Sequence, residues 1–287
     1  MRYVWLLTLL ICCGSGFAQE NDLTVAERIA TLENSGDTFL SLYQSDILTL
    51  PLDVTGLTQL EVLELSGNQL DDLPADFANL LNLRELILAD NQFTEIPPVI
   101  FELSNLERLD LSGNQLMTVP DELSQLMNLH NLTLRNNPLE DFPLAVTGLS
   151  NLRELNLTNT GLERLPAEIA EMTALQSLFL DNNALASLPS EIANLADLRE
   201  LSLSANQFED VPREIADLSA LRFVVINDNP LSRVPAELNL FNTQAVIEYA
   251  ATPEGYLVQD VSLWLIFLAG GVSLLIIFLR WRSKLDM

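Results

Sequence analysis

Acidic side chains recur at a fixed distance from proline, and they are the residues of this sequence with the clearest potential for chemistry. Carboxylates at a repeated spacing could serve general acid–base catalysis or bind a divalent cation. They lie two residues after a proline, at Asp53, Asp76, Glu122, Glu168, Glu191, Glu214 and Glu237. Val99 and Ala145 break the series, which a catalytic or metal array tolerates badly. A short helix that begins with proline and carries an acid in its first turn explains the spacing better, so we interpret these acids as helix caps.

Other nucleophiles and metal ligands are scarce. The sequence contains two cysteines, Cys12 and Cys13, and one histidine, His130. Neither a Cys/His nucleophile pair nor a Cys/His metal cluster can be assembled from these residues. We therefore expect a protein without enzyme activity, cofactor or bound metal, in which His130 is a surface residue.

The composition bounds the partners of the protein. The chain has 287 residues, 48% of them hydrophobic, and a formal net charge of −26. That length allows a sizeable buried core. A surface this acidic repels phosphate backbones, which excludes nucleic acid as a partner.

Prolines and asparagines repeat in one register along most of the chain. Nine prolines follow one another every 23 residues, from Pro51 to Pro235. Asparagines keep the same spacing from Asn68 to Asn229, with Thr160 in that position once and Ser45 opening the series. Fixed periods of this length indicate a repeat protein, so we expect nine repeats over residues 37–240.

The repeat LxxLxLxxNxLxxLPxxIxxLxx, seen in full at residues 60–82, resembles that of leucine-rich repeat proteins, in the 23-residue variety of Ras-suppressor-like and many bacterial proteins. The resemblance covers about 70% of the chain. It implies a curved solenoid with a parallel sheet on its concave side, usually a protein-binding surface. It identifies the fold much more specifically than the function.

The residues support an α/β leucine-rich repeat solenoid independently. Leu63 and Leu65 alternate with Glu64, as a strand with one buried face requires. Strands pack about 4.8 Å apart whereas helices need about 10 Å, so the coils bend with a parallel sheet on the concave face and short helices or turns on the convex side. The repeated asparagine is expected to turn inward and pair with backbone groups where each strand ends.

Both ends of the solenoid need a cover. Thr24 and Glu27 have the spacing of a capping box, and Val25, Ile29 and Leu32 share one face. We expect an N-terminal cap helix within residues 19–36. Residues 241–260 are expected to form a C-terminal cap and a juxtamembrane linker.

The two termini indicate export and membrane anchoring. Residues 1–18 read as a signal peptide, with a basic start, an apolar run and a small-x-small site at residues 16–18. Residues 261–279 carry no charge and would span about 28 Å as a helix, near the roughly 30 Å of a bilayer core. Arg280, Arg282 and Lys284 follow, so the positive-inside rule places residues 280–287 in the cytoplasm. We expect a single-pass membrane protein whose N-terminal domain is extracytoplasmic, at the cell surface or in the periplasm.

A partner would bind at the solvent-facing positions of the strands. Apolar side chains at such positions have no packing role, although isolated ones are ordinary on protein surfaces and the pair 223–225 could pack on the C-terminal cap. The candidate binding residues are Ile87, Arg108, Arg135, Phe179, Asp181, Phe223 and Val225. Two glycosylation sequons, at Asn131 and Asn156, are also expected on the concave face.

The charge of the outward segment suggests the chemistry of the partner. Residues 19–260 hold 39 of the 40 acids and 10 of the 14 basic residues, a net charge of −29. A basic protein or peptide would be attracted, although such acidity also serves solubility or tolerance to salt.

Two functions are left open. The favoured one is a membrane-anchored recognition or scaffold module that binds a protein or peptide on its concave face, with residues 261–279 in the lipid bilayer. The alternative is a structural or surface-display protein whose C-terminal helix is a sorting signal. The sequence decides neither the ligand nor the oligomeric state.

Overall fold

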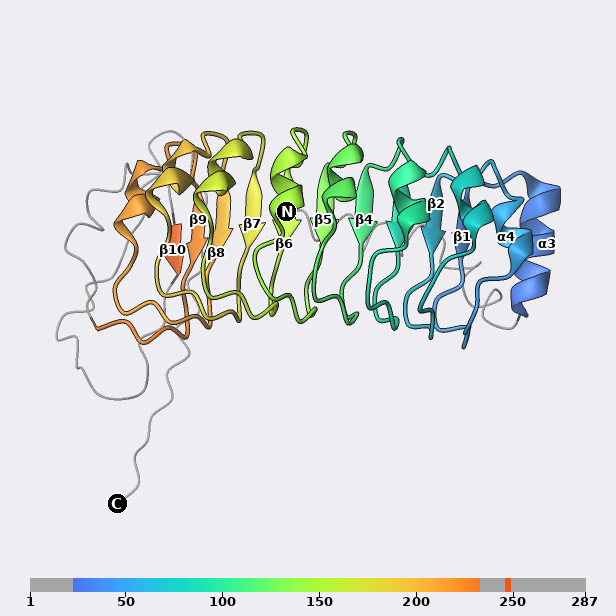
Figure 1. Cartoon of the computed structure of the whole chain (residues 1–287), viewed down its shortest axis with the longest axis horizontal. Coiled ribbons are helices and arrows are strands. Elements are labelled where there is room, and N and C mark those ends of the chain that lie inside the picture. The colour runs from blue at the N-terminus through green and yellow to red at the C-terminus, as the bar shows by residue number, and fades with distance from the viewer. Residues whose placement is uncertain (1–22, 233–245, 249–287) are drawn as a thin grey trace, which may run out of the picture. The chain divides into compact units, whose positions relative to one another are not determined.

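The computed structural model describes residues 23–232 and 246–248. A helix comes first, and short strands then alternate with short helices along the chain (Figure 1). The strands are β1 (Phe39–Ser41), β2 (Val62–Glu64), β3 (Glu85–Ile87), β4 (Arg108–Asp110), β5 (Asn131–Thr133), β6 (Glu154–Asn156), β7 (Ser177–Phe179), β8 (Glu200–Ser202), β9 (Phe223–Val225) and β10 (Val246–Glu248). The helices are α3 (Val25–Ser35), α4 (Leu52–Thr55) and the 3-10 helices η1 (Ala75–Asn79), η2 (Pro98–Glu102), η3 (Asp121–Gln125), η4 (Leu144–Gly148), η5 (Ala167–Glu171), η6 (Ser190–Asn194) and η7 (Arg213–Asp217).

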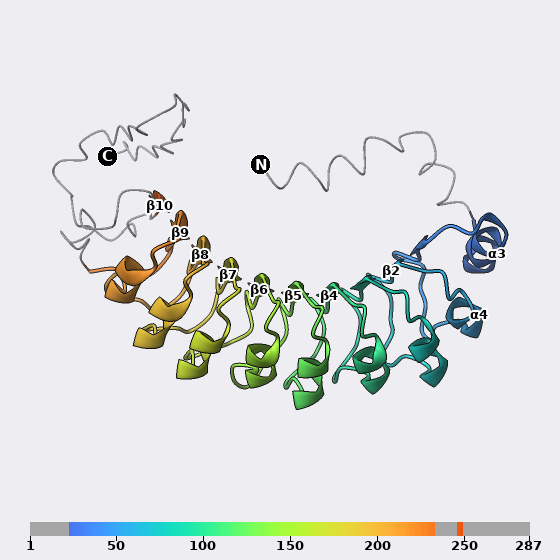
Figure 2. The ribbon, with the colours of Figure 1, turned by 90° about the horizontal axis from the view of Figure 1, so that it is seen from above.

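The strands form one parallel sheet in sequence order, from β1 to β10. From β1 to β9, each residue pairs with the residue 23 positions later, as Leu63 does with Leu86, so equivalent side chains lie in straight rows across the sheet. Figure 2 shows the coils from β1 to β9 following an arc, with the strands along its inner edge and the short helices along its outer edge. The predicted leucine-rich repeat solenoid is thereby confirmed.

Leucines fill the space between sheet and helices. The middle residue of every strand from β1 to β9 points inward, and Leu63, Leu109 and Leu155 are fully buried. The helix α3 covers the first coil with Ile29 and Leu32, which belong to the same continuous core. Thr24 and Glu27 make the capping box at its start, in which the Glu27 N–H donates to the Thr24 hydroxyl and the Thr24 N–H donates to the Glu27 carboxylate.

A ladder of buried asparagines holds consecutive coils together. In one coil, the Asn91 amide donates to the carbonyl oxygens of Leu65 and Leu88, at 3.0 and 3.1 Å. Its amide oxygen accepts the N–H of Leu70 at 3.0 Å. One side chain thus pairs three backbone groups that the end of the strand leaves over, as the sequence predicts.

The residue before each ladder position takes a left-handed conformation, which the sequence analysis does not anticipate. Asp90, Asn136 and Ala205 have φ between 52° and 56°. Glycine takes this place at Gly113, where a Cβ atom would lie 2.1 Å from Oδ1 of Asp90. The left-handed turn is therefore set by the ladder residue that follows it. Residues other than glycine are accepted at the position before that residue.

The prediction for proline is wrong by one position. The repeated proline is expected at the first helical residue, but Pro74 and its equivalents directly precede the helices. Its carbonyl accepts the first hydrogen bond of the helix, as Pro74 does from the N–H of Phe77 at 2.9 Å. Acids such as Asp76 and Glu168 lie in the first turn, where the helix dipole favours them, but no side chain makes a capping hydrogen bond at the start of either helix.

Several predicted segments lie outside the described residues. They are the signal peptide (1–18), most of the C-terminal cap and linker (241–260), the membrane helix (261–279) and the tail (280–287). Across residues 23–232 and 246–248, no helix has the length and apolar character needed to cross a bilayer.

Candidate binding surface

The concave face is built from rows of outward-facing side chains. The first and third residues of most strands are half-buried, while the middle residue is buried. Because the register advances by one repeat per strand, every outward position becomes a row with one residue per coil. A ligand lying along the arc would therefore meet side chains about 4.8 Å apart.

The seven predicted binding residues all belong to the strands of this face or to the turns that follow them. Arg108 and Phe223 are first residues of strands, and Ile87, Phe179 and Val225 are third residues. Arg135 and Asp181 follow β5 and β7 by two positions. The structure separates Ile87 and Arg108, near the N-terminal end, from the residues of β7–β9.

Three of these side chains gather near the C-terminal end of the described sheet. Phe179 and Val225 lie in one row with the small Ser202 between them, and Phe223 begins the same strand as Val225. We call Phe179, Phe223 and Val225 the apolar patch. β9 is followed in the sheet by β10, and Phe223 is 53% exposed. An exposed aromatic beside two further apolar residues is typical of a contact surface.

Two predicted residues are engaged within the protein. The Asp181 carboxylate accepts the hydroxyl of Ser202 and the N–H of Ser204, the latter at 2.8 Å. Arg108 forms an ion pair with Glu85 at 3.4 Å. These contacts hold Asp181 and Arg108 in place on the concave surface. Arg135, by contrast, is exposed and has no ion-pair partner among the described residues.

A further row lies directly before the strands, and the sequence analysis missed it. Its members are Glu61, Arg84, Glu107, His130, Arg153, Gln176, Arg199 and Arg222. Their backbones form a continuous ladder, in which each N–H from Arg84 to Arg222 donates to the carbonyl of the preceding member at 2.7–2.8 Å. The signal was present in the sequence, because four arginines share the 23-residue register at the first x of LxxL.

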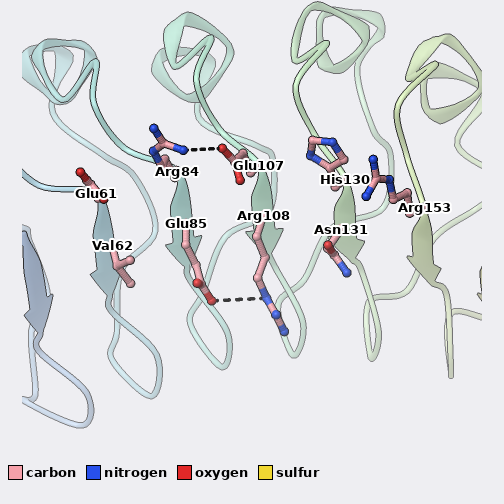
Figure 3. A pocket seen from close by; sticks show the side chains of 9 residues that line it. All are labelled: Glu61, Val62, Arg84, Glu85, Glu107, Arg108, His130, Asn131 and Arg153. Atoms are coloured by element: carbon pink, nitrogen blue, oxygen red, sulfur yellow. Dashed lines mark hydrogen bonds and ion pairs between the residues drawn. The ribbon is translucent and has the colours of Figure 1, made fainter. Parts of the chain in front are cut away.

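Residues of this row and of the first strand row enclose a hollow of about 510 Å³ (Figure 3). Arg84 pairs with Glu107 at 2.9 Å on one side of the hollow. His130 and Arg153 continue the same edge of the hollow, and Glu85, Arg108 and Asn131 lie along the other edge. The lining is polar and charged, so the hollow suits a hydrophilic part of a ligand.

Carboxylates dominate the N-terminal part of the face. Burial raises the pKa of Glu64, and the nearby charges of Asp110 and Glu85 raise it further, while hydrogen bonds from Ser66 oppose the shift. The structure places these acids close enough to repel one another. Such repulsion favours a cation or a basic group in this part of the face.

The sequon asparagines lie on the concave face as predicted, and both are engaged. Asn131 donates to the Glu154 carboxylate at 2.9 Å, and the Asn156 amide oxygen accepts the N–H of Thr158 at 3.0 Å.

The proline-linked acids from Asp53 to Glu214 lie in the short helices, on the opposite side of the coils from this face, and Glu237 lies outside the described residues. Within residues 23–232 and 246–248, no cluster of three or more His, Cys, Asp or Glu side chains could hold a metal ion.

Comparison with solved structures places this arrangement among known repeat domains. An internalin C2 from Listeria monocytogenes is 32% identical, with a TM-score of 0.61, and the match covers 69% of this chain and 83% of that one. A leucine-rich repeat protein from Leptospira interrogans is also 32% identical, with a TM-score of 0.66, over 72% of this chain. The match covers 54% of the Leptospira chain, so our chain spans about half of that protein.

A receptor ectodomain also shares the fold. The leucine-rich repeat ectodomain of the plant membrane receptor kinase GASSHO1/SCHENGEN3 from Arabidopsis thaliana, solved in complex with CASPARIAN STRIP INTEGRITY FACTOR 2, is 34% identical with a TM-score of 0.56. The match covers 64% of this chain and 23% of the ectodomain.

Comparison with curated protein sequences gives no match. Leucine rich repeat sequence profiles match residues 59–80, 81–139 and 173–231. Together with the internalin match, they show that the chain belongs to the leucine-rich repeat family.

Proposed function

We propose that this chain is a non-enzymatic recognition module that holds a protein or peptide on its concave face. The apolar patch carries the proposal, because Phe223 is exposed on a strand whose register gives it no packing role. The receptor ectodomain of the same fold, solved in complex with a partner, supports a role in protein interaction. The short strands and turns of the concave face present a row of side chains to an extended ligand rather than a deep pocket.

Export and anchoring complete the proposal. A signal peptide at residues 1–18 and a membrane helix at 261–279 would place the solenoid outside the cytoplasm, tethered to the bilayer. The intact mass of the protein from its native membrane tests this. A mass matching residues 19–287 supports a tethered module, whereas loss of the C-terminal segment supports the surface-display alternative.

The exclusion of nucleic acid is also part of the proposal and rests on charge. The fold alone does not decide it, because a TLR13–ssRNA13 complex has a similar fold. The net charge of −26 opposes binding of a long phosphate backbone that runs over the whole face.

Replacing Phe179 and Arg135 together with alanine should weaken ligand binding at least tenfold while leaving the melting temperature unchanged. Arg135 is exposed, and Phe179 is half-buried on the concave side outside the core, so their loss removes contacts with a ligand and little core packing. The probe is the set of peptides enriched on the full chain from a random phage-displayed library, with affinity measured by anisotropy.

The matched control is Leu144→Ala with Arg164→Ala, which also removes one apolar side chain and one arginine. Leu144 is exposed at the start of η4, and Arg164 pairs with Asp141 at 3.7 Å on the surface. Equal affinity of the wild type and the Phe179/Arg135 variant, or a larger loss in the control, would place the binding surface elsewhere.

A further inference from the structure

Arginines are concentrated on the concave face of this acidic protein. Residues 23–232 contain 33 acidic residues and nine arginines. Six of the nine lie in or next to the strands, at Arg84, Arg108, Arg135, Arg153, Arg199 and Arg222. The net charge of the whole chain therefore does not describe the charge of its candidate binding surface.

The arginines differ in whether the protein itself neutralises them. Arg84 and Arg108 pair with Glu107 and Glu85. Arg153, Arg199 and Arg222 are exposed and have no ion-pair partner among the described residues. We call these three the arginine row.

The arginine row is a continuous structural feature. Its residues belong to the same backbone ladder, with Gln176 between Arg153 and Arg199. Three strand spacings separate its ends, which corresponds to about 14 Å or about four residue steps of an extended peptide. The guanidinium groups are thus spaced for side chains along one short segment.

The apolar patch lies beside the row. Arg222 directly precedes Phe223, and Arg199 directly precedes the strand that lies between Phe179 and Val225. The acids on the strands and turns next to the row are Glu154, Asp181, Glu200, Asp228 and, on β10, Glu248. Hydrogen bonds hold Glu154 and Asp181 within the sheet, because Glu154 accepts the Asn131 amide and Asp181 accepts two donors from the neighbouring coil. Among the described residues, none of Glu154, Asp181, Glu200 and Asp228 forms an ion pair with the arginines of the row.

We propose that the arginine row and the apolar patch together bind an extended acidic segment of a partner protein, with carboxylates on the row and an apolar side chain on the patch. This inference rests on the proposed function and names the chemistry of the ligand. Arginine binds carboxylate in a bidentate geometry, and the adjacent aromatics supply apolar contact. The basic partner expected from the net charge would meet arginines at this part of the face.

A short acidic segment fits the surface better than a nucleic acid. The row ends at Arg153, and the coils before it present Glu61, Glu64, Glu85 and Asp110. A phosphate backbone that continues past the row would meet these acids and be repelled. A segment of about five residues contacts the row alone.

The test uses the full chain in detergent and three fluorescent eight-residue peptides, DFEGDFES, its neutral counterpart NFQGNFQS and the basic KFKGKFKS. The acidic peptide should bind at least tenfold more tightly than the neutral one. Raising salt from about 50 mM to about 500 mM should remove most of that difference, because the contacts are exposed. Arg199→Gln with Arg222→Gln should weaken binding of the acidic peptide about tenfold.

Arg164→Gln with Arg213→Gln is the control, since it changes the net charge equally at arginines outside the concave face. It should leave the affinity for the acidic peptide within twofold. Equal binding of the acidic and neutral peptides, tighter binding of the basic peptide or of an oligothymidylate, or equal losses in the two variants would overturn the proposal.

Failure of this inference is separable from failure of the proposed function. If library-selected peptides lose affinity in the Phe179/Arg135 variant but not in the Arg199/Arg222 variant, the concave face binds ligands without using the row. If neither variant affects any peptide, both proposals fail.

Discussion

Replacing Asn137 with alanine is expected to lower the free energy of unfolding by about 3 kcal/mol or more. The Asn137 side chain is 1% exposed, and its amide donates to the carbonyl oxygens of Leu111 and Leu134, both at 2.9 Å. Its oxygen accepts the N–H of Leu116 at 3.0 Å. Alanine leaves these three backbone groups without a partner in the core, and each such group costs about 1–3 kcal/mol. Urea denaturation of the full chain, followed by circular dichroism, measures the loss.

Asn137→Thr is the matched control, because the protein carries threonine at the equivalent Thr160. There the hydroxyl donates to the Leu157 carbonyl at 2.8 Å, so one of the pairings survives. Threonine should therefore cost clearly less than alanine. An alanine variant within about 0.5 kcal/mol of the wild type would contradict the structural role of the ladder.

Replacing Leu132 with glutamate should have the largest effect on stability, about 4–5 kcal/mol or more. Leu132 is fully buried in β5 and pairs with Leu109 and Leu155, which are also fully buried. A carboxylate there has no positive partner and must be desolvated among leucines. We expect the variant to be unfolded or to melt far below the wild type in a thermal scan.

Thr133→Glu places the same charge one residue later, where the side chain faces solvent. It is expected to cost less than about 1 kcal/mol, mainly through repulsion with Asp110 on the neighbouring strand. If Leu132→Glu melted like the wild type, or if both variants lost the same stability, the assignment of inward and outward positions would be wrong.

The 23-residue period makes most of the fold predictable. Leu63 and Leu65 define the buried face of a strand, and Asn68 marks its end. The pattern within one repeat therefore predicts both the rows of outward-facing side chains and the ladder of buried asparagines. The predicted proline position is wrong by one residue. Pro74 lies before the helix and accepts its first hydrogen bond with its carbonyl, whereas the prediction places the proline inside the helix, where its fixed φ would be used. The left-handed residue is missed because Asp90 and Ala205 occupy it as well as glycine.

The binding surface is less predictable because it depends on neighbours one repeat away. Asp181 looks available in the sequence, but Ser202 and Ser204 of the next coil occupy its carboxylate. Arg84 and Arg153 hold equivalent positions, yet only Arg84 has an acid, Glu107, within reach. The total charge predicts a basic partner, whereas the concentration of arginines on the concave face leads us to propose an acidic one.

Photo-crosslinking tests the central claim, that the concave face binds the partner, most directly. A photoreactive phenylalanine analogue is placed at Phe179 on β7, or at the exposed Leu144 on η4 on the other side of the coils, in the full chain expressed in its source cells. We predict a discrete crosslinked product from position 179 that is absent from position 144 and is reduced by Arg199→Gln with Arg222→Gln. Crosslinking from position 144 alone, or equally from both positions, would show that the partner does not bind the concave face.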